Sequence, residues 1–341
     1  MSATEHEVRT SPARSSLDIF YVADAAAERW SHDESVIAVI RFGSRTSFQG
    51  RQRPQISIAL PPLGSQRYAE VWRSNLPIVR GREGDLHYAL DGEILFGCLL
   101  VDDAGDLRDV ARNAYVRVLE LTRQLAYPHL ARVWNYFSDI NREYDGLERY
   151  RAFCVGRYDA FSGLGYHTRQ LAAASAIGTH ASGLLLYFIS AREPGTPIEN
   201  PRQVSAFRYP LRYSPRHPLF SRAMIKHWDC ATHLYISGTA SVVGHRTYHS
   251  EDTLEQLRET ARNIEAVVSR AKEAHPFILE AARQLSHVKI YVRRPEDLFR
   301  IQSEFDRLFS PALPRVFLHA DICRPDLLLE IDAFYSESLT A

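Results

Sequence analysis

The 341-residue sequence has no excess charge of either sign, because 41 lysine and arginine residues balance 41 aspartate and glutamate residues. A protein that binds a polyanion normally carries a basic excess, so this balance argues against nucleic acid as a partner. The longest apolar run, around Gly183 to Ala191, is far too short to span a membrane. The first fifteen residues, 1–15, are polar and lack the apolar core of a signal peptide, so we expect them to be disordered.

Cysteine is scarce, and the sequence carries no familiar metal or cofactor motif. The four cysteines, none in CxxC spacing, are Cys98, Cys154, Cys230 and Cys323. Such scattered cysteines argue against a zinc site or a redox pair and favour a reducing, cytoplasmic location. The fourteen histidines form neither HxH nor HExxH, and the glycines near Gly163 do not form GxGxxG. We therefore expect no metal and no cofactor.

Hydrophobic periodicity predicts alternating strands and helices in both halves of the chain. In the first half we expect strands at Val36–Phe42, Gln55–Leu60, Glu93–Val101, Leu130–Phe137 and two within Ala172–Ser190, and helices at Asp106–Ala126 and Leu147–Phe161. In the second half we expect strands at His233–Val243, His287–Val292, Arg315–Cys323 and Leu327–Phe334, and helices at Asp252–Ala274 and Pro295–Phe309. Between the halves, the proline-rich segment Glu193–Arg216 excludes a long helix and is typical of a linker that also crosses a site.

The two halves show the same order of sequence patterns. LFGCLLVD matches LYISGTAS, LARVWNYFSDI matches HVKIYVRRPEDL, and IGTHASGLLLYFISA matches DICRPDLLLEIDAF. This indicates an internal duplication of one β-rich α+β unit, with domains at 16–195 and 196–341 that pack together and hold sites at their seam. When the LLL triplets are aligned, Glu330 corresponds to Tyr187 and Cys323 to His180.

Glu330 is the leading candidate for a functional residue, because it interrupts the apolar run LLLEI. A buried carboxylate is costly unless it is paired or protonated, so its presence indicates a working group. From the pattern alone, a structural glutamate paired with an arginine such as Arg315 is equally compatible.

Arginines and tyrosines in two segments are candidates for binding anions. Tyr150 and Arg157 lie two turns apart on one side of a predicted helix and could grip one carboxylate. Tyr213, Arg216 and Arg222 in and after the crossing segment could grip another. Surface or solvated arginines would give the same pattern, and a lone Cys323 would also suit a core position.

Specific motifs in the second half resemble the RidA/YjgF family over about residues 233 to 335. The matching residues are Ser237, Gly238, Gln256, Asn263, Arg315 and Glu330. Across the whole chain the resemblance is closer to the chorismatases, which consist of two such units. Its motifs are RYRAFCVGRYDAF, YPLRYSPR with FSRA, ISGTAS and ADICRPDLLLEIDAF.

The resemblance implies a fold of two tandem RidA/YjgF-like units and a substrate, chorismate, from which these enzymes release pyruvate. It implies that Glu330 is a general acid for the enol ether, and that Gly238 leaves room for the ring. The pair Gly238 and Cys323 is similar to that of the 3-hydroxybenzoate-forming type, with Cys323 directing the product. A hydrolytic enzyme that yields a dihydrodiol, a mixed 3- and 4-hydroxybenzoate producer, and a RidA-like imine deaminase or ligand-binding protein remain alternatives. RidA relatives are trimers, but a duplicated chain makes a monomer plausible.

Overall fold

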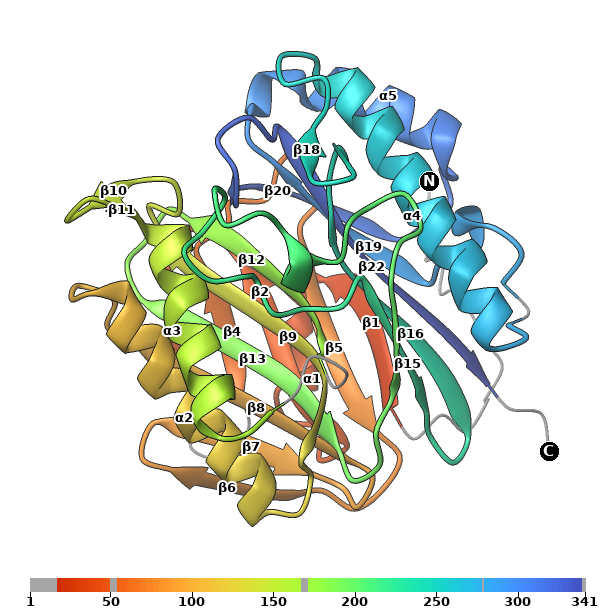
Figure 1. The fold of residues 1–341 in the computed structure, drawn as a ribbon. Helices are drawn as coiled ribbons and strands as arrows, with labels where there is room; N and C mark the ends of the chain where they lie inside the picture. Colours follow the sequence, from red (N-terminus) through yellow and green to blue (C-terminus); the bar gives the residue numbers. More distant parts are fainter. Residues whose placement is uncertain (1–16, 50–53, 167–170, 278, 339–341) are drawn as a thin grey trace, which may run out of the picture.

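The structure is a computed structural model that describes residues 17–49, 54–166, 171–277 and 279–338 (Figure 1). The predicted disorder of residues 1–15 falls outside these described residues. The fold is α+β, as predicted, and consists mainly of three mixed sheets of five, seven and six strands. No helix among the described residues is both long and apolar enough to cross a membrane.

The first sheet is formed by the N-terminal segment, drawn in red and orange in Figure 1. Its strands, in spatial order, are β1 (Leu17–Ala23), β5 (Tyr68–Ser74), β2 (Val36–Phe42), β4 (Gln55–Ile58) and β3 (Ser47–Gln49). One short helix, α1 (Ala27–Trp30), follows the 3-10 turn Asp24–Ala26.

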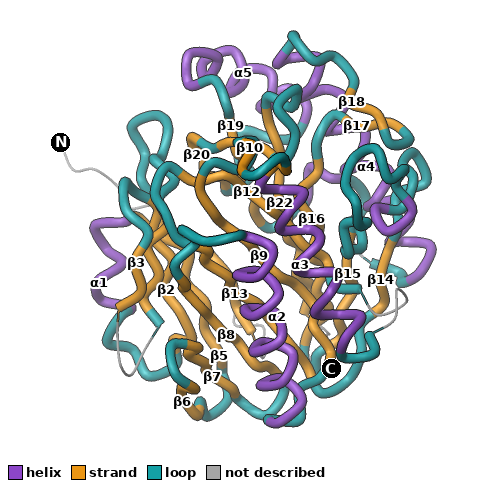
Figure 2. The backbone as a smooth tube through the Cα atoms, turned by 60° about the vertical axis from the view of Figure 1, so that its left-hand side comes forward, coloured by secondary structure: helices purple, strands orange, loops and turns teal. Residues whose placement is uncertain are grey.

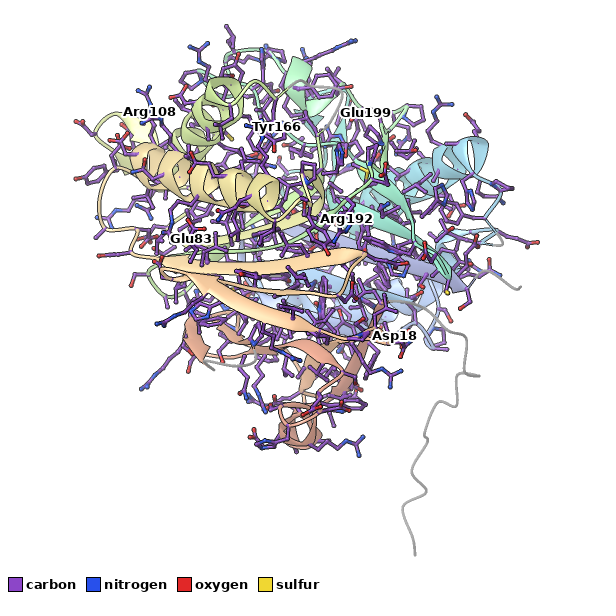
Figure 3. The ribbon with its side chains drawn as sticks, turned by 90° about the horizontal axis from the view of Figure 1, so that it is seen from below. Asp18, Glu83, Arg108, Tyr166, Arg192 and Glu199 are labelled. Atoms are coloured by element: carbon purple, nitrogen blue, oxygen red, sulfur yellow. The ribbon has the colours of Figure 1, made fainter. Side chains whose placement is uncertain are left out.

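The second sheet carries two long helices on its outer face, as the view from below shows (Figure 3). Its strands, in spatial order, are β21 (Asp321–Ile322), β12 (Ala173–Thr179), β9 (His129–Ser138), β13 (Leu184–Ala191), β8 (Ile94–Val101), β7 (Leu86–Leu90) and β6 (Val79–Glu83). The helices are α2 (Leu107–Gln124) and α3 (Arg149–Gly163), and a small hairpin, β10 (Glu143–Tyr144) with β11 (Leu147–Glu148), precedes α3.

The third sheet is built in the same way from the C-terminal part of the chain. Its strands, in spatial order, are β14 (Thr196–Ile198), β15 (Ala223–His227), β16 (Ala231–Thr239), β22 (Leu329–Ser338), β19 (His287–Val292) and β20 (Arg315–His319). Helices α4 (Thr253–Ala274) and α5 (Leu298–Leu308) cover its outer face, and β17 (Val242–Val243) pairs with β18 (Arg246–Thr247) in a separate hairpin. Short 3-10 turns lie at Ala206–Arg208, Ala282–Gln284 and Pro295–Asp297.

Strand pairing confirms the predicted duplication. The order β6-β7-β8-β13-β9-β12 in the second sheet has the same pairings as β14-β15-β16-β22-β19-β20 in the third, with one parallel pair each, β9 with β12 and β19 with β20. In both units the last strand inserts between two earlier strands. This is the arrangement of two tandem units that the sequence predicts.

The first sheet repeats the inner part of the same topology, which the sequence did not reveal. Its strands β1, β5, β2 and β4 pair as β8, β13, β9 and β12 do, again with one parallel pair. Only short α1 stands where the other units have a long helix. The segment predicted as one domain, 16–195, therefore contains two sheets.

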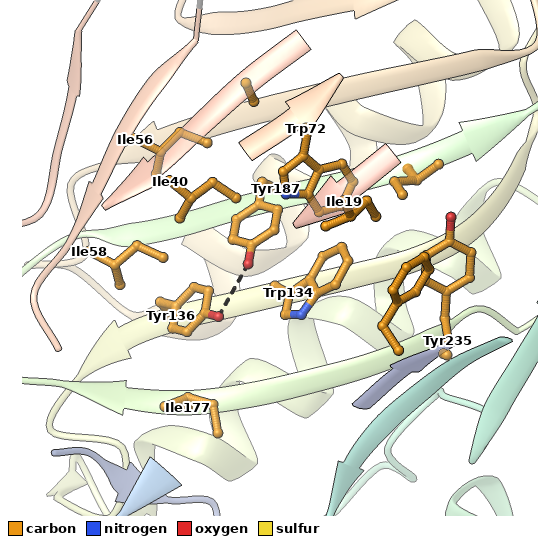
Figure 4. Packing of buried hydrophobic residues seen from close by; sticks show 14 of the residues in the cluster. Ile19, Ile40, Ile56, Ile58, Trp72, Trp134, Tyr136, Ile177, Tyr187 and Tyr235 are labelled. Atoms are coloured by element: carbon orange, nitrogen blue, oxygen red, sulfur yellow. Dashed lines mark hydrogen bonds between the residues drawn. The ribbon is translucent and has the colours of Figure 1, made fainter. Parts of the chain in front are cut away.

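The inner faces of all three sheets meet in one core rich in aromatic side chains (Figure 4). Trp72 comes from the first sheet, Trp134 and Tyr187 from the second, and Tyr291 from the third. The tube view shows the helices outside the strands, so the sheets form the centre of the molecule (Figure 2). Burial of such large side chains contributes about 1.5–3 kcal/mol each.

Two local differences from the predicted elements shape the site. The predicted helix at Leu147 begins only at Arg149, because Leu147 and Glu148 pair with β10. The predicted strand Arg315–Cys323 is interrupted at Ala320, and β21 leaves the third sheet to pair with β12 of the second. Cys323 is therefore placed at the seam between the two units.

Candidate active site

Strand β12 of the second sheet meets β16 of the third sheet at a polar seam. The backbone N–H of Ala174 donates to Ser237 Oγ at 2.9 Å, and the N–H of Gly238 donates to Ser175 Oγ at 2.9 Å. Just before β15, the N–H of Ser221 donates to the Ala172 carbonyl at 3.0 Å. These bonds fix the two units against each other where the predicted site residues lie.

A cavity of about 610 Å³ opens at this seam, and a niche of about 40 Å³ lies against its inner end. Both volumes are lined by Tyr150, Pro218, Phe220, Gly238, Cys323 and Glu330. Arg157 lines only the niche, whereas Tyr213, Arg222 and Arg324 line only the larger cavity. Ligand sites are commonly apolar cavities with a few convergent polar groups, and this one has that composition.

Glu330 lies at the junction of the two cavities on β22, and its residue is only 4% exposed. Within the described residues, no hydrogen bond or ion pair reaches its carboxyl group, and Arg315 instead pairs with Asp306 at 2.6 Å. Burial, and then the negative charge of Asp332, raise the pKa of Glu330 to about 8, against the opposing effects of Arg132 and Arg222. The side chain can therefore hold a transferable proton at neutral pH.

Gly238 lies directly beneath that carboxyl group. A Cβ atom at this position would come within 1.7 Å of Glu330 Oε1. The space left by the missing side chain therefore holds the Glu330 carboxyl rather than open room for a substrate ring. The glycine allows the acid to approach the backbone closely.

Cys323 lies between the cavity and the niche, and its side chain is partly buried. Burial, and then the neighbouring Glu330, raise the pKa of its thiol above the ordinary value. The group is therefore a neutral thiol, which is a weak nucleophile but a good polarisable wall for a pocket.

Helix α3 brings Tyr150 and Arg157 together in the niche, as their seven-residue spacing predicts. Arg157 is 4% exposed, and its Nε and Nη2 atoms have no hydrogen-bond partner in the described residues. Its guanidinium lies over the Tyr115 ring at 4.9 Å and the Phe161 ring at 5.5 Å. A buried cation with unused donors is a ready site for an anion.

Of the three residues predicted in and after the crossing segment, Tyr213 and Arg222 line the cavity. Arg222 donates to Tyr209 Oη at 2.7 Å and to the Val204 carbonyl at 3.0 Å, and its buried Nε has no hydrogen-bond partner in the part of the chain that the structure describes. Tyr213 Oη lies 3.0 Å from His245 Nδ1. Arg216 does not reach the cavity.

The exposed guanidinium of Arg216 lies 4.9 Å from the centre of the Tyr158 ring instead. We therefore omit it from the proposed site.

Sequence reasoning missed Arg324 and the residues beneath Glu330. Arg324 lies 4.4 Å from the Tyr213 ring centre and donates to the His245 carbonyl at 3.0 Å, so it holds the β17–β18 hairpin beside the cavity. Its place directly after Cys323 was the only available signal. Ser175 belongs to the other unit, so no motif near Glu330 could have indicated it.

Comparisons with known proteins place the chain in a family. Residues 70–190 match the family described as chorismatase FkbO/Hyg5-like, N-terminal. The chain is 36% identical to a 3-hydroxybenzoate synthase of Streptomyces hygroscopicus over 87% of this chain and 91% of that protein. It is 34% identical to a chorismatase of Streptomyces rapamycinicus over 88% of this chain and 92% of that protein.

A solved structure extends the similarity to three dimensions. A chorismatase crystal structure superposes with a TM-score of 0.87 at 32% identity, covering 94% of this chain and 98% of that one. The cavity at the seam between the two units is thus part of a fold that a solved chorismatase shares. The chain belongs to the chorismatase family.

Proposed function

We propose that this protein converts chorismate into pyruvate and 3-hydroxybenzoate. The observation that carries the proposal is the buried Glu330 carboxyl group, which has no hydrogen-bond or ion-pair partner among the described residues, lies on Gly238 and faces the cavity beside Cys323. The similarity to a protein named 3-hydroxybenzoate synthase supports the choice of product. Chorismate carries two carboxylates, and the cavity and its niche offer separate cations for them.

Glu330 is the proposed general acid. Its proton passes to the methylene carbon of the enolpyruvyl ether, which converts the ether into a better leaving group. A carboxyl group with a pKa near 8 is largely protonated at neutral pH and still acidic enough to transfer its proton.

In this scheme, one arginine and one tyrosine bind each of the two carboxylates of the substrate. The inner niche, with Arg157 and Tyr150, is sized for a carboxylate rather than a ring, so we assign it the ring carboxylate. Arg222 and Tyr213 in the larger cavity then face the enolpyruvyl carboxylate. This arrangement places the ether near Glu330, which lies between the two volumes.

The 3-hydroxybenzoate route consumes no water. As the bond between C3 and the ether oxygen breaks and pyruvate leaves, the oxygen of the 4-hydroxyl bonds to C3 and its proton returns to the Glu330 carboxylate. The resulting ring oxide opens at its C4–O bond, and the proton lost from C3 balances the one gained by the oxygen. Cys323 lines the cavity and favours this path by excluding water from the ring.

The same proposal covers organisation. The site takes residues from both 16–195 and 196–341, so one chain supplies the seam without a second copy. We therefore propose a monomeric enzyme with these two domains, and its free, scattered cysteines favour a cytoplasmic location.

Chromatography of the products formed from chorismate tests the reaction. We expect 3-hydroxybenzoate with pyruvate. A dihydrodiol would identify the hydrolytic alternative, and an added 4-hydroxybenzoate fraction would identify the mixed type. If chorismate is not consumed, the result would favour a RidA-like deaminase or a ligand-binding protein instead.

Activity should fall as the pH rises through about 8. Only the protonated form of Glu330 donates, and burial sets the pKa of that group to about 8, so kcat/KM is high below this pH and lost above it. A pH profile of kcat/KM measures this decrease, which is the falling limb of the profile. A flat profile between pH 6 and pH 10 would contradict the acid assignment.

Changing Cys323 should alter the product more than the rate. Replacing Cys323 with alanine widens one wall of the cavity and leaves Glu330 in place, whereas Gly238→Ala adds a methyl group that must displace the Glu330 carboxyl and should lower the rate as well. We expect the fraction of products other than 3-hydroxybenzoate to rise. Cys230→Ala, at a cysteine outside the cavity lining, is the control. Unchanged products would remove Cys323 from the mechanism.

A further inference from the structure

A closed hydrogen-bond cluster lies under the proposed acid, and the mechanism above does not use it. It consists of Ser175 on β12, Arg132 on β9 and Asp332 on β22, all buried. Ser175 Oγ accepts from the N–H of Gly238 at 2.9 Å and from Arg132 Nη2 at 2.5 Å, and donates to Asp332 Oδ1 at 2.5 Å. Arg132 Nη2 also lies 2.9 Å from Asp332 Oδ1.

The carboxylate of Asp332 is held from both sides. Besides the contacts to Oδ1, Trp134 Nε1 donates to Oδ2 at 2.9 Å and Tyr291 Oη donates to it at 3.0 Å. An ionised carboxylate accepts about four hydrogen bonds, so this group is fully satisfied and fixed. Its oxygens are therefore held in one position.

The cluster contacts the backbone beneath the Glu330 carboxyl and places a second carboxyl group near it. Through Ser175 it holds the N–H of Gly238, the residue against which the Glu330 carboxyl lies. Asp332 is two residues after Glu330 on the same strand, so both side chains are on the same face of β22.

We propose that three residues, Ser175, Arg132 and Asp332, are positioning residues for Glu330. This inference rests on the proposed function of Glu330 as the general acid. They fix the backbone on which its carboxyl group lies and place an immobile negative charge beside it.

The charges around Glu330 support this role. Burial is the largest cause of the raised pKa of Glu330, and Asp332 on the same strand raises it further. Arg132 from β9 and Arg222 from the segment before β15 lower it, and the neighbouring Cys323 thiol is neutral. If Asp332 loses its charge, two cations remain and favour the ionised acid. The acid then loses its proton at a lower pH.

Two variants test the proposal. Asp332→Asn should move the falling limb of the kcat/KM profile to lower pH by about 1–3 units. Ser175→Ala frees the N–H of Gly238 and should lower kcat about 10- to 100-fold, because the acid is misplaced, while KM stays within about twofold. Should Asp332→Asn fail to fold with Arg132 uncompensated, Ser175→Ala decides alone.

Thr179→Ala is the matched control, because it removes another buried hydroxyl from β12 that donates to the Ala181 carbonyl at 2.9 Å. It should leave kcat and the pH profile as in the wild type. The proposal is overturned if the folded Ser175 and Asp332 variants behave like this control. Glu330→Gln, measured in the same series, separates the two ideas: if it is inactive while the cluster variants are normal, only the positioning role fails.

Discussion

The Glu330→Gln variant should lose turnover of chorismate by at least about 10²- to 10⁴-fold, the contribution expected of a general acid. Glutamine has nearly the same shape as a protonated glutamate and fits over Gly238, but its amide cannot donate a proton to carbon. Chorismate should still bind, because the cations of the cavity and niche are untouched. Steady-state kinetics and calorimetric binding measure the two effects separately.

Stability provides an internal check on this variant. The pKa of Glu330 in the folded chain, about 8, is above its ordinary value of 4.5, so ionisation disfavours the folded state increasingly between these two pH values. Glutamine cannot ionise. The melting temperature of the Glu330→Gln variant at pH 8 should therefore equal or exceed that of the wild type.

Glu259→Gln is the matched control, since Glu259 is also 4% exposed but pairs with Arg202 and Arg262. It should lower stability and spare activity. Wild-type rates for Glu330→Gln would end the acid assignment.

The Arg157→Gln variant should raise the KM for chorismate about 10- to 100-fold, with a smaller effect on kcat. Each hydrogen bond from a charged donor contributes about 1.5–3 kcal/mol, and two unpartnered donors of Arg157 are available to a carboxylate. Arg157→Lys keeps the charge but loses the fork, so its KM should be intermediate.

The fold should tolerate the Arg157 change, because no ion pair within the described residues is broken. Arg216→Gln is the control, since Arg216 lies over Tyr158 outside the cavity and should leave KM unchanged. If Arg216→Gln raises KM and Arg157→Gln does not, the assignment of the two carboxylate sites is wrong.

The long elements of the two large units could be predicted because their periodicity is strong. Asp106 and Asp252 cap α2 and α4 where the patterns begin, and β2 and β19 have the predicted bounds. The first sheet was not recognised as a third copy of the unit, because it lacks the long helices that make the repeat visible.

The candidate site was predictable only where one stretch of sequence carries the signal. Glu330 is conspicuous as an acid in an apolar strand, and Arg157 follows Tyr150 at helical spacing. Ser175 and Arg132 reach Glu330 only through the pairing of two units, which depends on tertiary structure. The prediction that Gly238 leaves space for the substrate ring was wrong, because the sequence does not show that the Glu330 carboxyl itself occupies this space.

The first sheet also shows what a structural acid in this kind of strand looks like. Glu70 on β5 is buried, but it pairs with Lys289 Nζ at 2.9 Å and accepts from Trp72 Nε1 at 2.7 Å. Glu330 has no such partner in the described residues. This contrast is the main structural reason to assign Glu330 to catalysis.

The most direct test of the central claim is the stoichiometry of products when the purified protein is incubated with chorismate. The account predicts pyruvate and 3-hydroxybenzoate in equimolar amounts, with no oxygen from labelled water in the aromatic product. No release of pyruvate, or a dihydrodiol in place of the phenol, would contradict it.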